Sequence, residues 1–162
     1  MFGPKSLTAE CSLAAIALVC ALLLGSCLGD SDSPDNPAAS DCEALTVHIT
    51  QAEAVPPAGK RINEVHRAQQ FAALADSLTE LVMTDGGVVE HRDRLVVLYR
   101  QMSDLGFQLS AYRDENGQVI ATGSNSAAYG QVTVQQRKLN FQLQEHYEQV
   151  RLYCNQVQAD AP

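Results

Sequence analysis

Apolar residues recur at alternating steps of three and four positions in three long segments of the chain, and this spacing marks one face of an α-helix. One such stripe runs through residues 88–112 and another through residues 129–157. The third lies between residues 60 and 84 and consists of Phe71, Leu74, Leu78 and Leu81. A row of smaller apolar residues lies beside it: Val65, Ala68, Ala72, Ala75 and Val82. Helices with a single apolar face bury it against one another. The pattern therefore predicts an all-α fold, an antiparallel bundle of three long helices.

Glycine-containing turns separate these segments. Asp85-Gly86-Gly87 follows the segment at 60–84 and favours a chain that leaves a helix. Asp114-Glu115-Asn116-Gly117 is a turn sequence between the last two segments, and short connections make consecutive helices antiparallel. Residues 106–122 also alternate like a β-hairpin around this turn. We expect the helix to continue through Tyr112, and a small β-hairpin at that tip of the bundle is the alternative.

Residues 41–55 fit two structures. Ser40 and Glu43 match a capping box, which begins a helix. One face of that helix would carry the apolar residues Cys42, Leu45, Ile49 and Ala52. The alternation between residues 45 and 49 also fits a strand. We expect a short N-terminal helix and then an extended link, because Pro56-Pro57 disfavours continued helix, with the next helix beginning at about residue 57.

The first 27 residues have the pattern of an export signal rather than of a fold. Residues 11–24 are almost wholly apolar, a length typical of a signal-peptide core and shorter than the roughly 20 residues that span a bilayer. The following Leu24-Gly25-Ser26-Cys27 resembles the lipobox of bacterial lipoproteins. The resemblance implies a cleaved signal peptide comprising residues 1–26 and a lipid on Cys27. Secretion with complete release and an uncleaved N-terminal anchor are the alternatives.

The same resemblance implies a location. Leu28, rather than aspartate, follows Cys27, and in enteric-type lipoproteins this implies the outer membrane, facing the periplasm. Residues 27–40 are small, acidic and proline-containing, so they cannot bury enough apolar surface to fold. We therefore expect a disordered tether over 27–40 and a bundle domain over 41–162, attached to the membrane through the lipid.

Two of the five cysteines remain once the signal peptide and Cys27 are set aside. Cys42 and Cys154 lie near the two ends of the domain, and an exported compartment permits disulfide formation. The pair lacks the Cys-x-x-Cys spacing of a redox site, so we interpret it as a structural disulfide. Two free thiols are the alternative.

The net charge excludes some partners. The 162 residues include 19 acidic and 11 basic side chains, a formal net charge of −8. Nucleic-acid binding needs a basic surface, and so does a polybasic grip on anionic lipid headgroups. The apolar content of 46% argues against wholesale disorder. Tryptophan is absent and aromatic residues are only 6%, which leaves little material for stacking against a carbohydrate.

His91 and His146 both occupy positions on the predicted apolar stripes. If the last two helices meet near residue 119, residue 91 lies level with residue 147, and Glu80 of the preceding segment lies nearby. Two imidazoles and a carboxylate can hold a metal ion, and two imidazoles a haem. The simpler interpretation is that both histidines are solvated or hydrogen-bonded structural residues.

No other catalytic or cofactor motif is present. The chain has no His-Glu-x-x-His and no Cys-x-x-Cys-His, and Gly86-Gly87 lacks the lysine of a phosphate loop. No serine or threonine stands in a recognisable nucleophile–base arrangement. We therefore assign no catalytic residue and expect neither an enzyme nor a cofactor.

The sequence favours a non-catalytic structural or adaptor module that binds another protein of the cell envelope. The loop at 113–126 is long for a helical hairpin, and long loops frequently carry function. Val119 and Ile120 are the candidate partner-binding residues in this loop. The last helix is rich in glutamine, which fits either a solvated face or a polar docking surface. The alternative function is a metal- or haem-binding bundle that uses His91 and His146.

Overall fold

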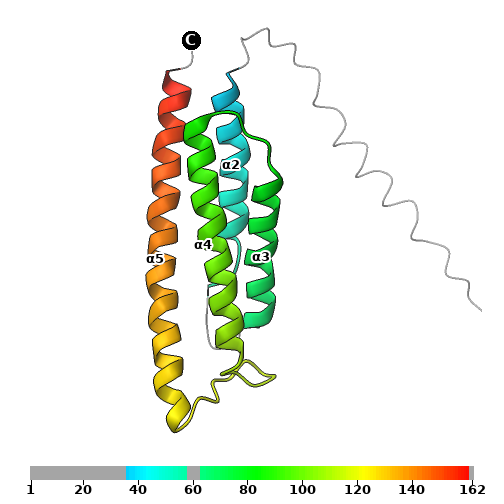
Figure 1. Cartoon of the computed structure of the whole chain (residues 1–162), viewed down its shortest axis with the longest axis vertical. Coiled ribbons are helices and arrows are strands. Elements are labelled where there is room, and N and C mark those ends of the chain that lie inside the picture. The colour runs from blue at the N-terminus through cyan, green and yellow to red at the C-terminus, as the bar shows by residue number, and fades with distance from the viewer. Residues whose placement is uncertain (1–35, 58–62, 161–162) are drawn as a thin grey trace, which may run out of the picture. The chain divides into compact units, whose positions relative to one another are not determined.

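A computed structural model of the chain describes residues 36–57 and 63–160, in which four α-helices follow one another (Figure 1). The helices are α2 (Pro37–Glu53), α3 (Glu64–Glu80), α4 (Gly86–Ser110) and α5 (Ser124–Ala159). Successive helices run in opposite directions. The predicted all-α antiparallel bundle is confirmed. The signal peptide, Cys27, most of the predicted tether and residues 58–62 of the predicted link lie outside the described residues.

α2 begins earlier than predicted. Asn36 caps it with a side-chain oxygen that accepts from Ala38 N at 3.1 Å, and Pro37 occupies the first helical position. Proline suits that position because its missing N–H would have had no partner inside the helix. The capping box predicted at Ser40 and Glu43 is therefore wrong, since both residues lie inside the helix.

α2 is as long as α3, at 17 residues each, so it is a full member of the bundle. Its start lies before the domain boundary expected at residue 41. We expected the next helix to begin at about residue 57, but α3 begins at Glu64. The later start shortens by about 10 Å, at 1.5 Å per residue, the distance that this helix covers between the two ends of the bundle. A helical α2 can therefore bring Cys42 level with Cys154, where their Cα atoms lie 5.5 Å apart.

The apolar faces predicted for α2 and α4 are buried. In α2 the buried residues are Cys42, Leu45, Ile49 and Ala52. In α4 the stripe members that become core are Val88, Leu95, Leu98, Met102, Leu105 and Leu109. α4 packs most extensively on α3, and α5 packs on α4 and α2. The core is thus built around α4, which has neighbours on several sides.

The buried face of α3 differs from the predicted stripe. Its apolar core residues are Ala68, Phe71, Ala75 and Leu78. Leu74 is only partly buried, and Val82, predicted beside the stripe, is 91% exposed because α3 has already ended at Glu80. An added Cβ at Gly106 of α4 would lie 2.9 Å from the Ala68 Cβ. Because residue 106 is a glycine, α3 can approach α4 closely, and this close approach buries the face of α3 that carries the small residues Ala68 and Ala75.

Two buried tyrosines join α4 to α5. The Tyr147 hydroxyl donates to the Tyr99 hydroxyl at 3.2 Å, and the two rings meet edge to face. Burial away from water raises the pKa of Tyr99 to about 12 and raises the pKa of Tyr147 as well. Both phenols are therefore neutral. Each lies one position away from a predicted stripe, which is why the pattern did not find them.

The chain turns sharply after α4. The helix ends at Ser110, two residues before the predicted Tyr112. Arg113 and Val119 then form an isolated antiparallel β-bridge, and Gly117 has a φ of 73°, which residues with a side chain disfavour. The helix prediction therefore holds up to Ser110. The hairpin alternative holds beyond it, although this single bridge does not extend into a strand within the described part of the chain.

Candidate functional site at the hairpin end

We call the start of α3, the end of α4 and the turn at residues 113–120 the hairpin end of the bundle. Asn63 caps α3, because its side-chain oxygen accepts from His66 N at 3.0 Å. The cap places Glu64 at the first helical position and Arg67 one turn later. Both side chains are buried, which is unusual for charged residues.

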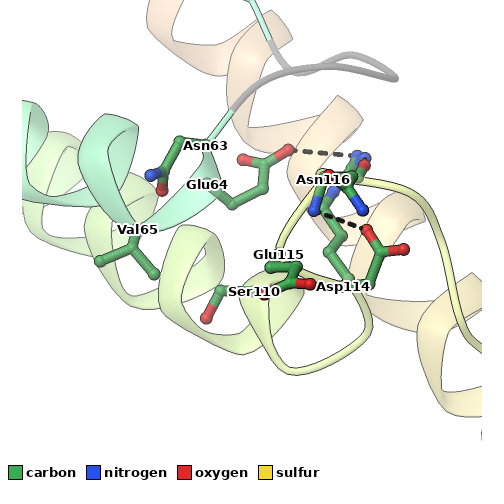
Figure 2. Close-up of a pocket in the computed structure, with 9 residues that line it drawn as sticks. Asn63, Glu64, Val65, Ser110, Asp114, Glu115 and Asn116 are labelled. Carbon is green, nitrogen blue, oxygen red and sulfur yellow. Dashed lines mark hydrogen bonds and ion pairs between the residues drawn. The ribbon is translucent and has the colours of Figure 1, made fainter.

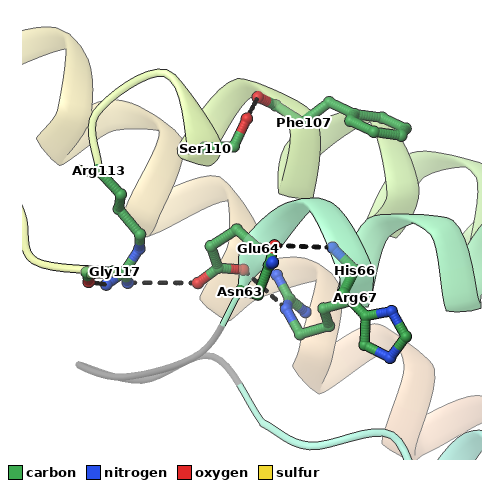
Figure 3. A network of polar contacts seen from close by, with 8 residues as sticks. All are labelled: Asn63, Glu64, His66, Arg67, Phe107, Ser110, Arg113 and Gly117. Atoms are coloured by element: carbon green, nitrogen blue, oxygen red, sulfur yellow. Dashed lines mark hydrogen bonds and ion pairs between the residues drawn. The ribbon is translucent and has the colours of Figure 1, made fainter. Parts of the chain in front are cut away.

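Glu64 forms a buried triad of charges with two arginines (Figure 3). Arg67 Nε donates to Glu64 Oε2 at 2.8 Å, and Arg113 Nη2 lies 3.2 Å from Glu64 Oε1. Arg113 Nη1 also donates to the Gly117 carbonyl oxygen at 2.7 Å. The Arg67 guanidinium lies 5.8 Å from the centre of the Phe71 ring. One carboxylate therefore ties the start of α3 to the turn that follows α4.

The triad is incompletely hydrogen-bonded within the described part of the chain. The buried atoms without a hydrogen-bond partner there are Glu64 Oε1, Arg67 Nη2, Gln70 Oε1, Arg113 Nε and Gln136 Nε2. Glu64 Oε1 touches Arg113 as an opposite charge but not along a hydrogen-bond direction. Each unpaired buried polar atom costs roughly 1–3 kcal/mol. The triad therefore holds the turn in position, while its unpaired polar atoms lower the stability of the fold.

A cavity of about 410 Å³ opens beside the triad (Figure 2). Its lining consists of Asn63, Glu64, Val65, Ser110 and residues 113–117. Asp114 stiffens the turn on its wall, because Asp114 Oδ1 accepts from the backbone N–H groups of Asn116 at 2.9 Å and Gln118 at 2.8 Å. The lining carries three carboxylates against one guanidinium. The lining is therefore acidic.

The predicted partner-binding residues lie exposed on this turn. Val119 and Ile120 both present about half of their surface to solvent. Ile120 N donates to the Tyr112 carbonyl oxygen at 2.9 Å, and Asp114 N donates to the Gln118 carbonyl oxygen at 2.9 Å. The backbone that carries the two apolar side chains is thus held on both sides of the turn. A partner that binds here has little backbone left to order, which favours affinity.

The sequence contained a signal for part of the triad that the stripe analysis missed. Glu64 lies four residues before Ala68, so it continues the core spacing of α3 backwards, and Arg67 lies beside it on the same face. A charge at a core position indicates a buried ionic partner. Arg113 had no such signal, because it lies outside any helix and only the folded turn brings it to Glu64.

We call the start of α2, the end of α5 and residues 81–85 the disulfide end. Cys42 and Cys154 are joined there by the predicted disulfide. Next to it, Asp41 Oδ2 accepts from the backbone N–H groups of Thr84 at 2.7 Å and Asp85 at 2.9 Å. α2 is therefore joined covalently to α5 and by hydrogen bonds to the segment that enters α4.

Asp85 links α4 to α5 at this end. Its Oδ1 accepts from Val88 N at 2.9 Å, which caps α4, and from the Tyr153 hydroxyl at 2.7 Å. The hydrogen bond from Val88, followed by that from Tyr153, lowers the pKa of Asp85, and the same contact raises the pKa of Tyr153. The Tyr153 ring lies over Gly87, where it leaves no room for a Cβ.

His91 and His146 share a layer, as the assumed register predicted, with ring centroids 5.2 Å apart. His146 Nε2 lies 3.2 Å from the His91 carbonyl oxygen, and His146 Nδ1 lies 3.1 Å from Gln149 Oε1. Burial, and then the charge of His146, lowers the pKa of His91. No group of three potential metal ligands occurs within the described residues, and Glu80 is exposed. The metal or haem site stays a prediction, and both nitrogens of His146 are already engaged.

The predicted lipidation site, Cys27, lies outside the described residues, as does the signal peptide. None of the four helices described is both long enough and apolar enough to cross a bilayer. Comparisons with models of protein families, with curated proteins and with solved structures find no match for this chain.

Proposed function

We propose that the chain is a lipid-anchored cell-envelope protein whose bundle is a non-catalytic module that binds another envelope protein at its hairpin end. The observation that carries the proposal is the exposure of Val119 and Ile120 on a hydrogen-bonded turn. The polar cavity beside the triad supplies hydrogen-bonding groups for the same partner. Apolar contacts beside satisfied polar ones are the usual composition of a protein interface.

The distance between the turn and the point where the chain enters the bundle supports this proposal. The chain enters the bundle at Asn36, at the disulfide end, whereas the turn lies at the opposite end (Figure 1). α5 has 36 residues and runs between the two ends, a distance of about 54 Å at 1.5 Å per residue. Within one chain, the turn is therefore remote from the point where the chain enters the bundle. By the lipobox resemblance, the anchor is a lipid on Cys27 in the outer membrane and the bundle faces the periplasm.

The partner-binding part is tested by replacing the two apolar side chains of the turn. The full chain carrying Val119→Asp and Ile120→Asp is crosslinked in the intact envelope of its host, beside the unchanged chain. Val82→Asp is the matched control, because Val82 is equally apolar, is exposed and lies at the disulfide end. We expect a discrete adduct with one envelope protein that the tip variant loses and the control keeps, at unchanged melting temperature. An adduct that survives in the tip variant contradicts the assignment of the hairpin end.

The anchoring part is tested separately. Cys27→Ser removes the atom that would carry the lipid, so we expect the chain to lose the lipid mass and to accumulate with its signal peptide uncleaved. Intact mass spectrometry of both proteins measures lipid and cleavage together. A processed, lipid-free chain from the unchanged sequence would instead support ordinary secretion, and would leave the binding proposal standing.

A further inference from the structure

The outward face of α5 carries a row of exposed apolar side chains. Val134, Phe141 and Leu152 expose 64%, 72% and 69% of their surface. They lie seven and eleven residues apart, so at 3.6 residues per turn they point within about 20° of one another. Buried residues of the same helix, such as Leu143, lie on the opposite side. This face is the one that α5 turns away from the rest of the bundle.

Charged residues complete this row at regular spacing. We call Val134, Lys138, Phe141, Glu145, Glu148 and Leu152 the outer seam of α5. Its steps alternate between four and three residues, which is the spacing of a helix–helix contact face. The base, Lys138, lies nearer the start of the helix and the two acids nearer its end. Within the described residues Lys138 and Glu145 form no ion pair, and Glu148 pairs with Arg151 at 2.8 Å.

We propose that the outer seam binds the outer seam of a second copy of this chain, with the two α5 helices antiparallel. One register satisfies the seam from end to end. Val134 then faces Leu152 of the second copy, and Lys138 faces Glu148 of the second copy, each contact occurring twice by symmetry. Phe141 packs against the side-chain carbons of Glu145 and, one turn away, against Phe141 of the second copy.

The charges of the outer seam favour a second copy of this chain as the partner, and they favour an antiparallel orientation of the two α5 helices. A parallel pair would set Lys138 against Lys138, and each acid against its own copy, which is repulsive. The antiparallel pair sets the base against an acid on both sides of the symmetry axis. The outer seam is thus complementary to the same seam running in the opposite direction. An interface formed by the same patch on both subunits requires this property.

The uncharged flank of the seam agrees with this arrangement. Gln131, Gln142 and Gln156 lie within about 80° of the seam on one side. A two-fold axis perpendicular to the helices brings the same flank of both copies together. Amide side chains both donate and accept hydrogen bonds, so identical flanks meet without repulsion. The self-association does not rest on the proposed function, because it uses another surface.

The first test reverses and then restores the charge pattern. Self-association of the full chain in mild detergent is measured by sedimentation, for Lys138→Glu and for the triple variant Lys138→Glu, Glu145→Lys, Glu148→Lys. We expect the single variant to weaken the dimer at least about tenfold and the triple variant to restore most of the affinity. Arg94→Glu is the matched control, an exposed base on α4 with no ion pair among the described residues. A monomeric unchanged chain, or an equal loss with Arg94→Glu, overturns the proposal.

The second test fixes the direction. Val134→Cys and Leu152→Cys in one chain should give an oxidised covalent dimer, because the two positions face each other across the axis. Either substitution alone should not, since in the antiparallel pair a residue and its own copy are about 18 residues, or 27 Å, apart along the axis. Disulfides require Cα atoms within about 7 Å. Efficient linkage by a single variant would show a parallel pair and overturn the register.

Discussion

The two ends of the bundle handle polar groups in opposite ways. At the disulfide end, Asp41 and Asp85 each accept several hydrogen bonds, and a covalent bond lies beside them. At the hairpin end, buried charges meet with several donors and acceptors left unpaired. Paired groups add stability, whereas incompletely paired buried charges do not. The difference indicates that one end closes the fold and the other holds a particular turn in place.

The largest effect is expected at the disulfide end. Cys42→Ser opens a link between residues 112 positions apart, and loop entropy assigns such a link about 4–5 kcal/mol. Urea unfolding of the full chain, oxidised against Cys42→Ser, measures it. Cys154→Ser should lose the same amount, and the double variant no more than either. A loss below about 1 kcal/mol would mean that hydrogen bonds alone close this end.

The hairpin end is expected to respond next. Glu64→Ala leaves two buried guanidiniums without their carboxylate, which costs about 3 kcal/mol in the same unfolding measurement. Asp76→Ala is the control, because it breaks only an exposed contact with Arg100 at 4.0 Å and should cost less than about 1 kcal/mol.

Replacing the whole triad sharpens the comparison further. The triple variant Glu64→Leu, Arg67→Leu, Arg113→Leu removes every charge of the triad, so the free energy of unfolding should change little. The turn should nevertheless lose its anchor, and hydrogen exchange at Gln118 N and Ile120 N should accelerate. Unchanged protection of these two amides would contradict a positioning role for the triad.

A smaller effect is expected where α3 and α4 approach. Gly106→Ala brings a Cβ to 2.9 Å from the Ala68 Cβ, and this overpacking should cost about 1–3 kcal/mol. Gly130→Ala is the control, because it lies within α5 with open space around it and should stabilise by about 0.5–1 kcal/mol. If both variants are stabilised, the helices have room that the structure does not show.

The smallest effect is expected on the stability of the bundle when the pH is lowered. Burial lowers the pKa of His91 below 6.5, so the unfolded chain takes up this proton first and stability falls as the pH drops through about 6.5. The hydrogen bonds that lower the pKa of Asp85 add a further loss at lower pH. Melting temperature between pH 7 and 5 should therefore fall less steeply in His91→Gln. An equally steep fall in His91→Gln would contradict this assignment.

The features that the sequence predicted are those that depend on residues close together along the chain. Once residues 41–55 were taken as helical, spacing gave the buried face of α2, because a helix repeats its face every 3.6 residues. The shared layer of His91 and His146 followed from the turn between two long helices. The start of α2 was mispredicted although its signal, Asn36 before Pro37, stands in the sequence. The prediction placed the cap at Ser40 because residues 27–40 were expected to be a disordered tether.

The sequence by itself determined the long helices and their antiparallel order, because periodicity and turn residues depend on neighbours along the chain. It named Cys42 and Cys154 as the candidate pair but left two free thiols open. Only the tertiary structure decided which face of α3 is buried and where Glu64 finds its second arginine. Those outcomes depend on how closely α3 approaches Gly106 and on where a turn places Arg113. Contacts between segments distant in sequence carry no periodic signal, since they arise only when the helices pack.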